Sequence, residues 1–496
     1  MACTTILVGK DASYDGSTMV SRNEDSPSGE FTPKKFIVVK PEDQPKVYTS
    51  VQSKVKVELP EEALTCTMMP DALGTIGFWG CCGINAANVG MSATETLTTN
   101  ERVLAADPLV NYQPAVGKKG DKNYQSEVIG GIGEEDMVSL VLPYIHTARE
   151  GVKRLGELLE TYGTYEMNGI AFHDANEIWW LETVGGHHWL AKRVPDDSYV
   201  VMPNQLGIDS FDLADALGDQ KEHMCSQDMK DFIDTYHLDL TLEDDFNPRI
   251  SLGSCSDADR VYNTPRAWVV QRYLNSKTNT WDGIDADYRP ESNDIPWSRV
   301  PERKITPEDI KYLLSNHYQE TPYDPYKKGE RQELYRPIGV NRTNVLGLTQ
   351  LRSDVSEPLQ GIEWIAFGSN VFNAMIPFYT HVSKTPEYLN NTDKDASTDS
   401  FYWTNRLIGA LADAHFQACL PHIERYQQTL TSQARAVILA TDEQVKSAKE
   451  QDVTAILEQA NEKIAALAKK ETQDLLNRVL YEASNQMKNG FARSDG

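Results

Sequence analysis

The strongest constraint on the fold comes from the first residues of the chain, where a strand begins almost at the amino terminus. Residues 3–8 (CTTILV) are apolar or β-branched and run into a turn-forming segment at residues 9–13, which is typical of a buried strand. Residues 16–22 (GSTMVSR) have the pattern of its hairpin partner. Further strand-like runs follow at residues 35–39, 55–59, 64–68 and 75–79. Strands this dense, separated by turn residues, predict an antiparallel sheet.

Helical periodicity is found in two later parts of the chain. Between residues 134 and 162, apolar side chains recur every three or four positions, which predicts an amphipathic helix. Strand patterns then resume at residues 169–173, 177–182, 188–194, 199–202 and 361–378. From about residue 385 the composition changes to long helical patterns at 402–430 and 452–487. We therefore predict a main domain over residues 1–384 and a helical C-terminal section over 385–496, which packs on that domain or on a partner subunit.

The charge and the cysteine content disfavour several classes of protein. The 496 residues include 48 Lys+Arg and 73 Asp+Glu, a formal net charge of −25, which argues against nucleic acid and anionic membrane surfaces as partners. No apolar run reaches the roughly 18 residues of a membrane span, and the first residues show no signal-peptide pattern. The seven cysteines are odd in number and contain no CxxC pair. We therefore expect mostly buried, reduced thiols and a cytoplasmic location.

The short motifs of common catalytic sites are absent from the sequence. There is no G-x-S-x-G, no phosphate-binding lysine loop, no H-E-x-x-H and no G-x-G-x-x-G. The adjacent His187 and His188 would point to opposite faces of a strand, which disfavours a shared metal ion. We expect neither a metal nor a cofactor.

The chemistry that the sequence does support lies at its amino terminus. A cysteine attacks as the thiolate, so it needs a base and nearby positive charge. Cys3 at a chain start would carry its own base, because an α-amino group has a pKa of about 7.7–8.0. A hairpin would return Arg22 and Asp25 close to Cys3; there Arg22 would favour the thiolate, and Asp25 would hold the ammonium or the arginine. Taken alone, Cys3 is equally compatible with an incidental residue.

Most of the chain resembles the dipeptidase A group of N-terminal-nucleophile (Ntn) cysteine hydrolases, the relatives of penicillin V acylase and bile-salt hydrolase. The matching segments are CTTILVGKDASYDGSTMVSRNEDS, GEEDMVSLVLPYIHTAREGV, NGIAFHDANEIWWLETVGGHHWLAKRVPDD, VVMPNQLGI and GSCSDADRVYNTPRAW. The resemblance implies an α+β fold, a four-layer αββα sandwich of two antiparallel sheets with helices outside. Residues 1–384 would be its catalytic domain.

The resemblance also implies roles for individual residues. The nucleophile would be Cys3, the arginine and aspartate beside it Arg22 and Asp25, an oxyanion-hole donor Asn204, and a second active-site arginine Arg260. The other oxyanion donor would lie near Glu95 or Thr96. Structural roles stay open as alternatives: Asn204 follows a proline and suits a turn, Arg22 and Arg260 suit ion pairs, and Asp25 suits a hairpin or cap.

The predicted function is therefore a cysteine dipeptidase of broad specificity, a thiol protease that acts through a thioester acyl-enzyme on dipeptide substrates. Because Met1 and Ala2 precede Cys3, its α-amine becomes free only when both residues are removed, and whether Cys3 makes the final cut itself by an N-to-S acyl shift stays open. One alternative is an amidase or acylase that uses the same nucleophile on N-acyl compounds. Another is a non-enzymatic protein that works through its C-terminal helices. Self-association into a homo-oligomer also stays open.

Overall fold

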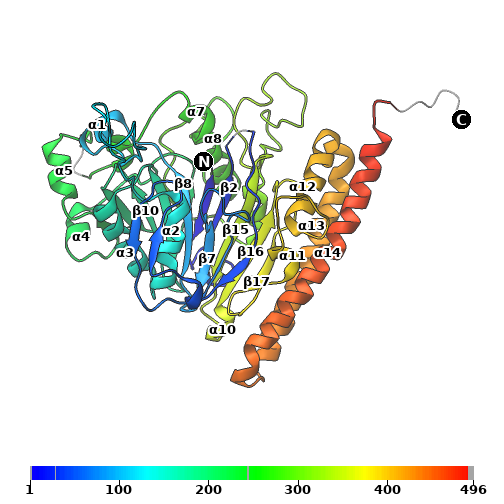
Figure 1. The fold of residues 1–496 in the computed structure, drawn as a ribbon. Coiled ribbons are helices and arrows are strands. Elements are labelled where there is room, and N and C mark those ends of the chain that lie inside the picture. The colour runs from blue at the N-terminus through cyan, green and yellow to red at the C-terminus, as the bar shows by residue number, and fades with distance from the viewer. Residues whose placement is uncertain (1–2, 28, 243–244, 490–496) are drawn as a thin grey trace, which may run out of the picture.

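Two large sheets packed face to face form the centre of the molecule. The computed structural model describes residues 3–27, 29–242 and 245–489. Within these residues every pairing between named strands is antiparallel, and helices cover the outer side of each sheet (Figure 1). The two sheets meet where β2 and β15 contact β7, β8 and β9. The predicted αββα sandwich is confirmed.

The first sheet carries the amino-terminal strand in its interior. Its seven described strands lie in the order β14 (Ser298–Arg299), β12 (Tyr199–Met202), β1 (Thr4–Val8), β2 (Thr18–Asp25), β15 (Thr343–Leu351), β16 (Gly361–Phe367) and β17 (Ile376–Tyr379). Strand β1 is therefore paired on both sides, and Thr5 lies opposite Met202 on one side and Arg22 on the other. The predicted hairpin of the first two strands is confirmed.

The second sheet packs against the first and supplies the other wall of the interior. Its eight described strands lie in the order β13 (His223–Cys225), β11 (Trp189–Arg193), β10 (Ile178–Thr183), β9 (Asn168–His173), β8 (Gly90–Thr96), β7 (Cys82–Asn85), β6 (Cys66–Met68) and β3 (Ile37–Val39). A separate hairpin is formed by β4 (Val47–Thr49) and β5 (Lys56–Glu58).

Each sheet is covered by its own set of helices. Helices α2 (Glu134–Val141) and α3 (Ala148–Tyr162) pack on β8–β11 of the second sheet. The first sheet is covered by α8 (Thr264–Leu274), α9 (Pro307–Leu314), α12 (Phe401–Ala412), α13 (Phe416–Val445) and α14 (Val453–Asn485). The last three form the long helical layer at the right of Figure 1. Shorter helices in the connections are α1 (Glu101–Ala106), α4 (Leu213–Leu217), α5 (Met229–Thr235), α6 (Pro248–Leu252), α7 (Asp259–Tyr262), α10 (Glu357–Gln360) and α11 (Glu387–Asn390).

Between residues 75 and 162, two local predictions differ from the structure for identifiable reasons. The single helix expected over residues 134–162 is broken between α2 and α3 at Pro143, because proline lacks the N–H that a continuous helix needs. The strand expected over residues 75–79 is a loop. Gly74, Gly77 and Trp79 have φ angles of 66°, 119° and 53° there, and a β-strand requires negative φ. The C-terminal helical region is confirmed, while the boundary between residues 384 and 385 stays a prediction.

Candidate active site

Cys3 lies immediately before β1, in the interior between the two sheets. Because side chains alternate along a strand, Cys3 shares a face with Thr5 of β1 and, across the hairpin, with Arg22 of β2. The hydroxyl of Thr5 donates to the Glu95 carboxyl of β8 at 2.8 Å, which shows that this face looks toward the second sheet. The Cys3 side chain is fully buried.

Arg22 is the residue that the hairpin places against the nucleophile candidate. Its Nη1 lies 3.3 Å from Cys3 Sγ, and the same nitrogen donates to the carbonyl of Thr94. Burial raises the pKa of the Cys3 thiol well above its usual value, and the positive charge of Arg22 opposes that rise. The arrangement can therefore stabilise a thiolate at Cys3 more than burial alone would allow.

Asn204 reaches the same site from the loop after β12. Since Thr5 lies opposite Met202, the register places Asn204 opposite Cys3. Its Nδ2 donates to Glu95 Oε1 and to the carbonyl of Thr96, each at 2.9 Å. The structure thus brings Cys3, Arg22 and Asn204 together, with Glu95 and Thr96 around the asparagine amide.

Arg266 of α8 is a site residue that the sequence did not single out. One guanidinium nitrogen donates to the backbone carbonyl of Cys3 and, at 2.8 Å, to Thr4 Oγ1. The other donates at 2.7 Å to the side-chain oxygens of both Asn204 and Asn263. Arg266 therefore joins the backbone of Cys3 to the Asn204 amide. It belongs to the matched segment GSCSDADRVYNTPRAW, which is the only sequence signal that pointed near it.

Arg260 and Asp25 lie apart from this cluster. Arg260 is exposed on α7, and no hydrogen bond between described residues joins it to Cys3, Arg22 or Asn204. Asp25 is fully buried but lies three residues after Arg22 on β2, hence on the opposite face. There its carboxylate accepts hydrogen bonds from Thr343 Oγ1 at 2.6 Å and from Arg336. The catalytic roles expected for Arg260 and Asp25 therefore stay predictions.

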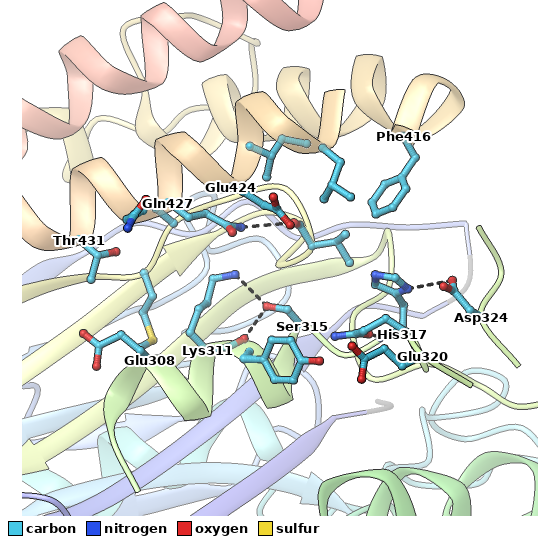
Figure 2. Close-up of a pocket in the computed structure, with 18 of the residues that line it drawn as sticks. Glu308, Lys311, Ser315, His317, Glu320, Asp324, Phe416, Glu424, Gln427 and Thr431 are labelled. Atoms are coloured by element: carbon cyan, nitrogen blue, oxygen red, sulfur yellow. Dashed lines mark hydrogen bonds and ion pairs between the residues drawn. The ribbon is translucent and has the colours of Figure 1, made fainter. Parts of the chain in front are cut away.

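The cavity drawn in Figure 2 is separate from the Cys3 site. It has a volume of about 670 Å³, lies between α9 and α13, and is lined by none of the Cys3 site residues. On one wall Lys311 Nζ lies 2.8 Å from Ser315 Oγ, and on another His317 Nδ1 lies 3.0 Å from Asp324 Oδ1 (Figure 2).

The described ranges contain neither a membrane-spanning helix nor a cluster of metal-binding side chains. No helix in these ranges has the length and apolarity to cross a membrane. The same ranges contain no group of three or more His, Cys, Asp or Glu side chains that could hold a metal ion. Six of the seven cysteines are buried, and Cys255 is exposed.

Comparison with known proteins agrees with the resemblance seen in the sequence. Residues 2–429 match the model of peptidase family C69. A protein of Bifidobacterium longum named "Dipeptidase" is 54% identical, and one of Streptococcus pyogenes serotype M3 named "Probable dipeptidase A" is 52% identical, both over 100% of each chain. "Dipeptidase A" of Lactobacillus helveticus is 43% identical over 98% of this chain and 97% of its own. The chain belongs to peptidase family C69 and is a hydrolase that acts on peptide bonds.

Proposed function

We propose that this hydrolase is a cysteine dipeptidase of broad specificity with Cys3 as its nucleophile. The observation that carries the proposal is the contact between Arg22 and the Cys3 sulfur at 3.3 Å in a fully buried site. Relatives named dipeptidase match the whole length of the chain and support the dipeptide as substrate class. An amidase or acylase that acts on N-acyl compounds is the second candidate, because the same nucleophile would serve it.

The proposal requires Cys3 to become the first residue of the mature chain. While Met1 and Ala2 are attached, the nitrogen of Cys3 is an amide and cannot act as a base. In an N-to-S acyl shift, Cys3 Sγ attacks the Ala2 carbonyl carbon, the Ala2–Cys3 C–N bond breaks, and the nitrogen leaves as the free amine. Water then hydrolyses the thioester and releases Met-Ala.

In the mature enzyme the α-amine of Cys3 takes the thiol proton, and the thiolate attacks the peptide carbonyl of the dipeptide. Arg22 stabilises the thiolate, and the Asn204 amide donates to the tetrahedral oxyanion. Losing one such donor typically costs about 10²–10³ in turnover. The ammonium of Cys3 then protonates the leaving amine, and water resolves the thioester. Arg266 acts as a positioning residue, since it holds the Cys3 carbonyl and the Asn204 side chain together.

Asp25 and Arg260 would act from outside the cluster of Cys3, Arg22 and Asn204. Asp25 would act through Arg336, with which it forms a buried ion pair. Arg260 would act from the exposed side of α7. A cytoplasmic location, where thiols stay reduced, would suit a catalytic cysteine.

The decisive test combines activity with the mass of the mature chain. Wild type and Cys3→Ala are assayed on a panel of free dipeptides and on their N-acetylated forms. The intact mass of each sample is measured by mass spectrometry. We expect wild type to lack Met1 and Ala2, to cleave free dipeptides and to spare the N-acetylated ones, and Cys3→Ala to be inactive. Full activity in Cys3→Ala, or in a chain that keeps Ala2, would overturn the mechanism. Preference for the N-acetylated substrates would favour the acylase instead.

A further inference from the structure

We propose that Glu134, with Glu166 beside it, binds the ammonium group of the dipeptide substrate. This inference rests on the proposed function, because it assigns a part of the substrate to a part of the same site. It makes the enzyme select for a free amino group through a buried carboxylate at the start of α2.

Glu134 is linked to the nucleophile through a single nitrogen atom. Arg22 Nη1 lies 3.3 Å from Glu134 Oε1 and 3.3 Å from Cys3 Sγ. The distance from Glu134 Oε1 to Cys3 Sγ is therefore at most the sum of these two distances. The side chains of Glu134 and Arg22 are each only 1% exposed, and Cys3 is fully buried, so the three groups lie together in the interior.

The geometry of a dipeptide fits this spacing. A thiolate poised for attack lies about 3–3.5 Å from the carbonyl carbon. The substrate nitrogen lies about 2.5 Å from that carbon, across one Cα, and a hydrogen bond to a carboxylate adds about 2.8 Å. The group that binds the ammonium should thus lie about one residue's length beyond the attacked carbonyl carbon. The distance of Glu134 from Cys3 Sγ is within that range.

One oxygen of Glu134 is available for such a cation. Its Oε2 is buried and has no hydrogen-bond partner among the described residues, and a buried carboxylate oxygen without a partner is unfavourable. Burial raises the pKa of Glu134 to about 7, and a bound ammonium would favour its ionised form.

Glu166 adds a second carboxylate at the same place. Its Oε1 accepts the backbone N–H of Glu134 at 2.9 Å, which fixes it at the amino end of α2. None of the described ion pairs involves Glu166. The buried Lys34 amine pairs with Glu24 at 2.5 Å. Glu134 pairs with Arg22 and Glu166 pairs with no described cation, so the ammonium of a bound dipeptide would be stabilised by two neighbouring carboxylates.

Glu24 offers a matched control for this proposal. It is also 1% exposed and also pairs with Arg22, at 3.1 Å, but its other oxygen pairs with Lys34. Replacing either glutamate by glutamine removes one partner of Arg22. Only the replacement of Glu134 also removes the available carboxylate oxygen, so the two variants separate ammonium binding from support of Arg22.

The experiment compares wild type, Glu134→Gln and Glu24→Gln, each checked for folding by thermal unfolding. The substrate is the dipeptide that wild type cleaves fastest, and the competing ligand is its des-amino analogue, in which hydrogen replaces the ammonium group. KM, kcat and the Ki of the analogue are measured for each protein. We expect Glu134→Gln to raise KM for the dipeptide about 10- to 100-fold and to leave Ki within about threefold. Glu24→Gln should lower kcat and move KM no more than Ki.

The outcomes distinguish this inference from the proposed function. If wild type cleaves no dipeptide, or cleaves the des-amino analogue equally well, the proposed function fails and the inference with it. If wild type is a dipeptidase but Glu134→Gln changes KM and Ki equally, or Glu24→Gln raises KM as much as Glu134→Gln, the ammonium site is overturned alone. Should Glu134→Gln not fold, Glu134→Asp keeps the charge beside Arg22 and withdraws it by one methylene, and the same selective rise in KM is expected.

Discussion

Replacing Arg266 by lysine tests the assembly of the active site most directly. The guanidinium of Arg266 contacts the carbonyl of Cys3 with one nitrogen and Asn204 Oδ1, at 2.7 Å, with the other. Its Nε donates at 2.7 Å to the carbonyl of Tyr262. A lysine ammonium is a point charge with three donors, so it cannot span both sides of the site as the planar guanidinium does.

The magnitude follows from the contacts that would be lost. Each hydrogen bond to a charged group is worth about 1.5–3 kcal/mol, and we expect Arg266→Lys to lower the free energy of unfolding by about 2–4 kcal/mol. Burial lowers the pKa of Arg266 from 12.5 to about 10; the same burial would act on a lysine whose usual pKa, about 10.4, is already lower than that of arginine, so lysine would hold its charge less firmly. Release of the Asn204 amide should then lower kcat about 10²-fold, near the cost of one oxyanion donor.

Arg260→Lys is the matched control, since it makes the same change six residues earlier on the exposed side of α7. Steady-state kinetics on one dipeptide give kcat, urea unfolding gives stability, and intact mass verifies that each variant is processed. We expect Arg260→Lys to keep kcat within about twofold, because lysine keeps the positive charge through which the exposed Arg260 would act. A tenfold loss in Arg260→Lys, with Arg266→Lys near wild type, would refute the reasoning and favour Arg260 over Arg266 as the arginine that supports catalysis.

Two further variants test other parts of the site. Asn204→Ala should lower kcat by about 10²–10³. The rate at which iodoacetamide alkylates Cys3 should stay within about threefold of wild type, because that reaction forms no oxyanion. Equal losses in kcat and in the alkylation rate would mean that Asn204 only positions Cys3. Burial raises the pKa of Glu95 from 4.5 to about 8. Between these two pH values the unfolded chain has an ionised Glu95 and the folded chain a neutral one, so the free energy of unfolding of wild type falls as the pH rises. Glu95→Gln lacks that loss, and its free energy of unfolding relative to wild type should rise by about 3–4 kcal/mol between pH 5 and pH 8 in urea titrations. A pH-independent difference would contradict the buried, neutral Glu95.

The strands at the start of the chain could be predicted because their pattern is local. The apolar run at residues 3–8 and its partner at 16–22 correspond to β1 and β2. The sandwich arrangement came from the family resemblance instead, since periodicity does not say which sheets pack together. Pro143 stands in the sequence, but the apolar spacing on both sides of it predicts one continuous helix, whereas the structure has a break there.

The site was harder to predict because side-chain direction depends on register. Arg22 and Asp25 are three residues apart in a strand, so they must face opposite sides, and only Arg22 meets Cys3. Arg260 and Arg266 stand six residues apart across the junction of α7 and α8. Which of them points inward depends on how α8 packs on β12, and no residue type signals that.

The position of β1 would allow the proposed nucleophile, Cys3, to work at the very start of a processed chain. Chain termini are usually poorly ordered unless they are tied down. Here β1 lies between β12 and β2, paired with both from Thr5 to Val8, and Arg266 holds the carbonyl of Cys3 itself. None of these bonds uses the nitrogen of Cys3, so removal of Met1 and Ala2 leaves all of them intact. The proposed processing step can therefore release the catalytic base without releasing the strand that positions it.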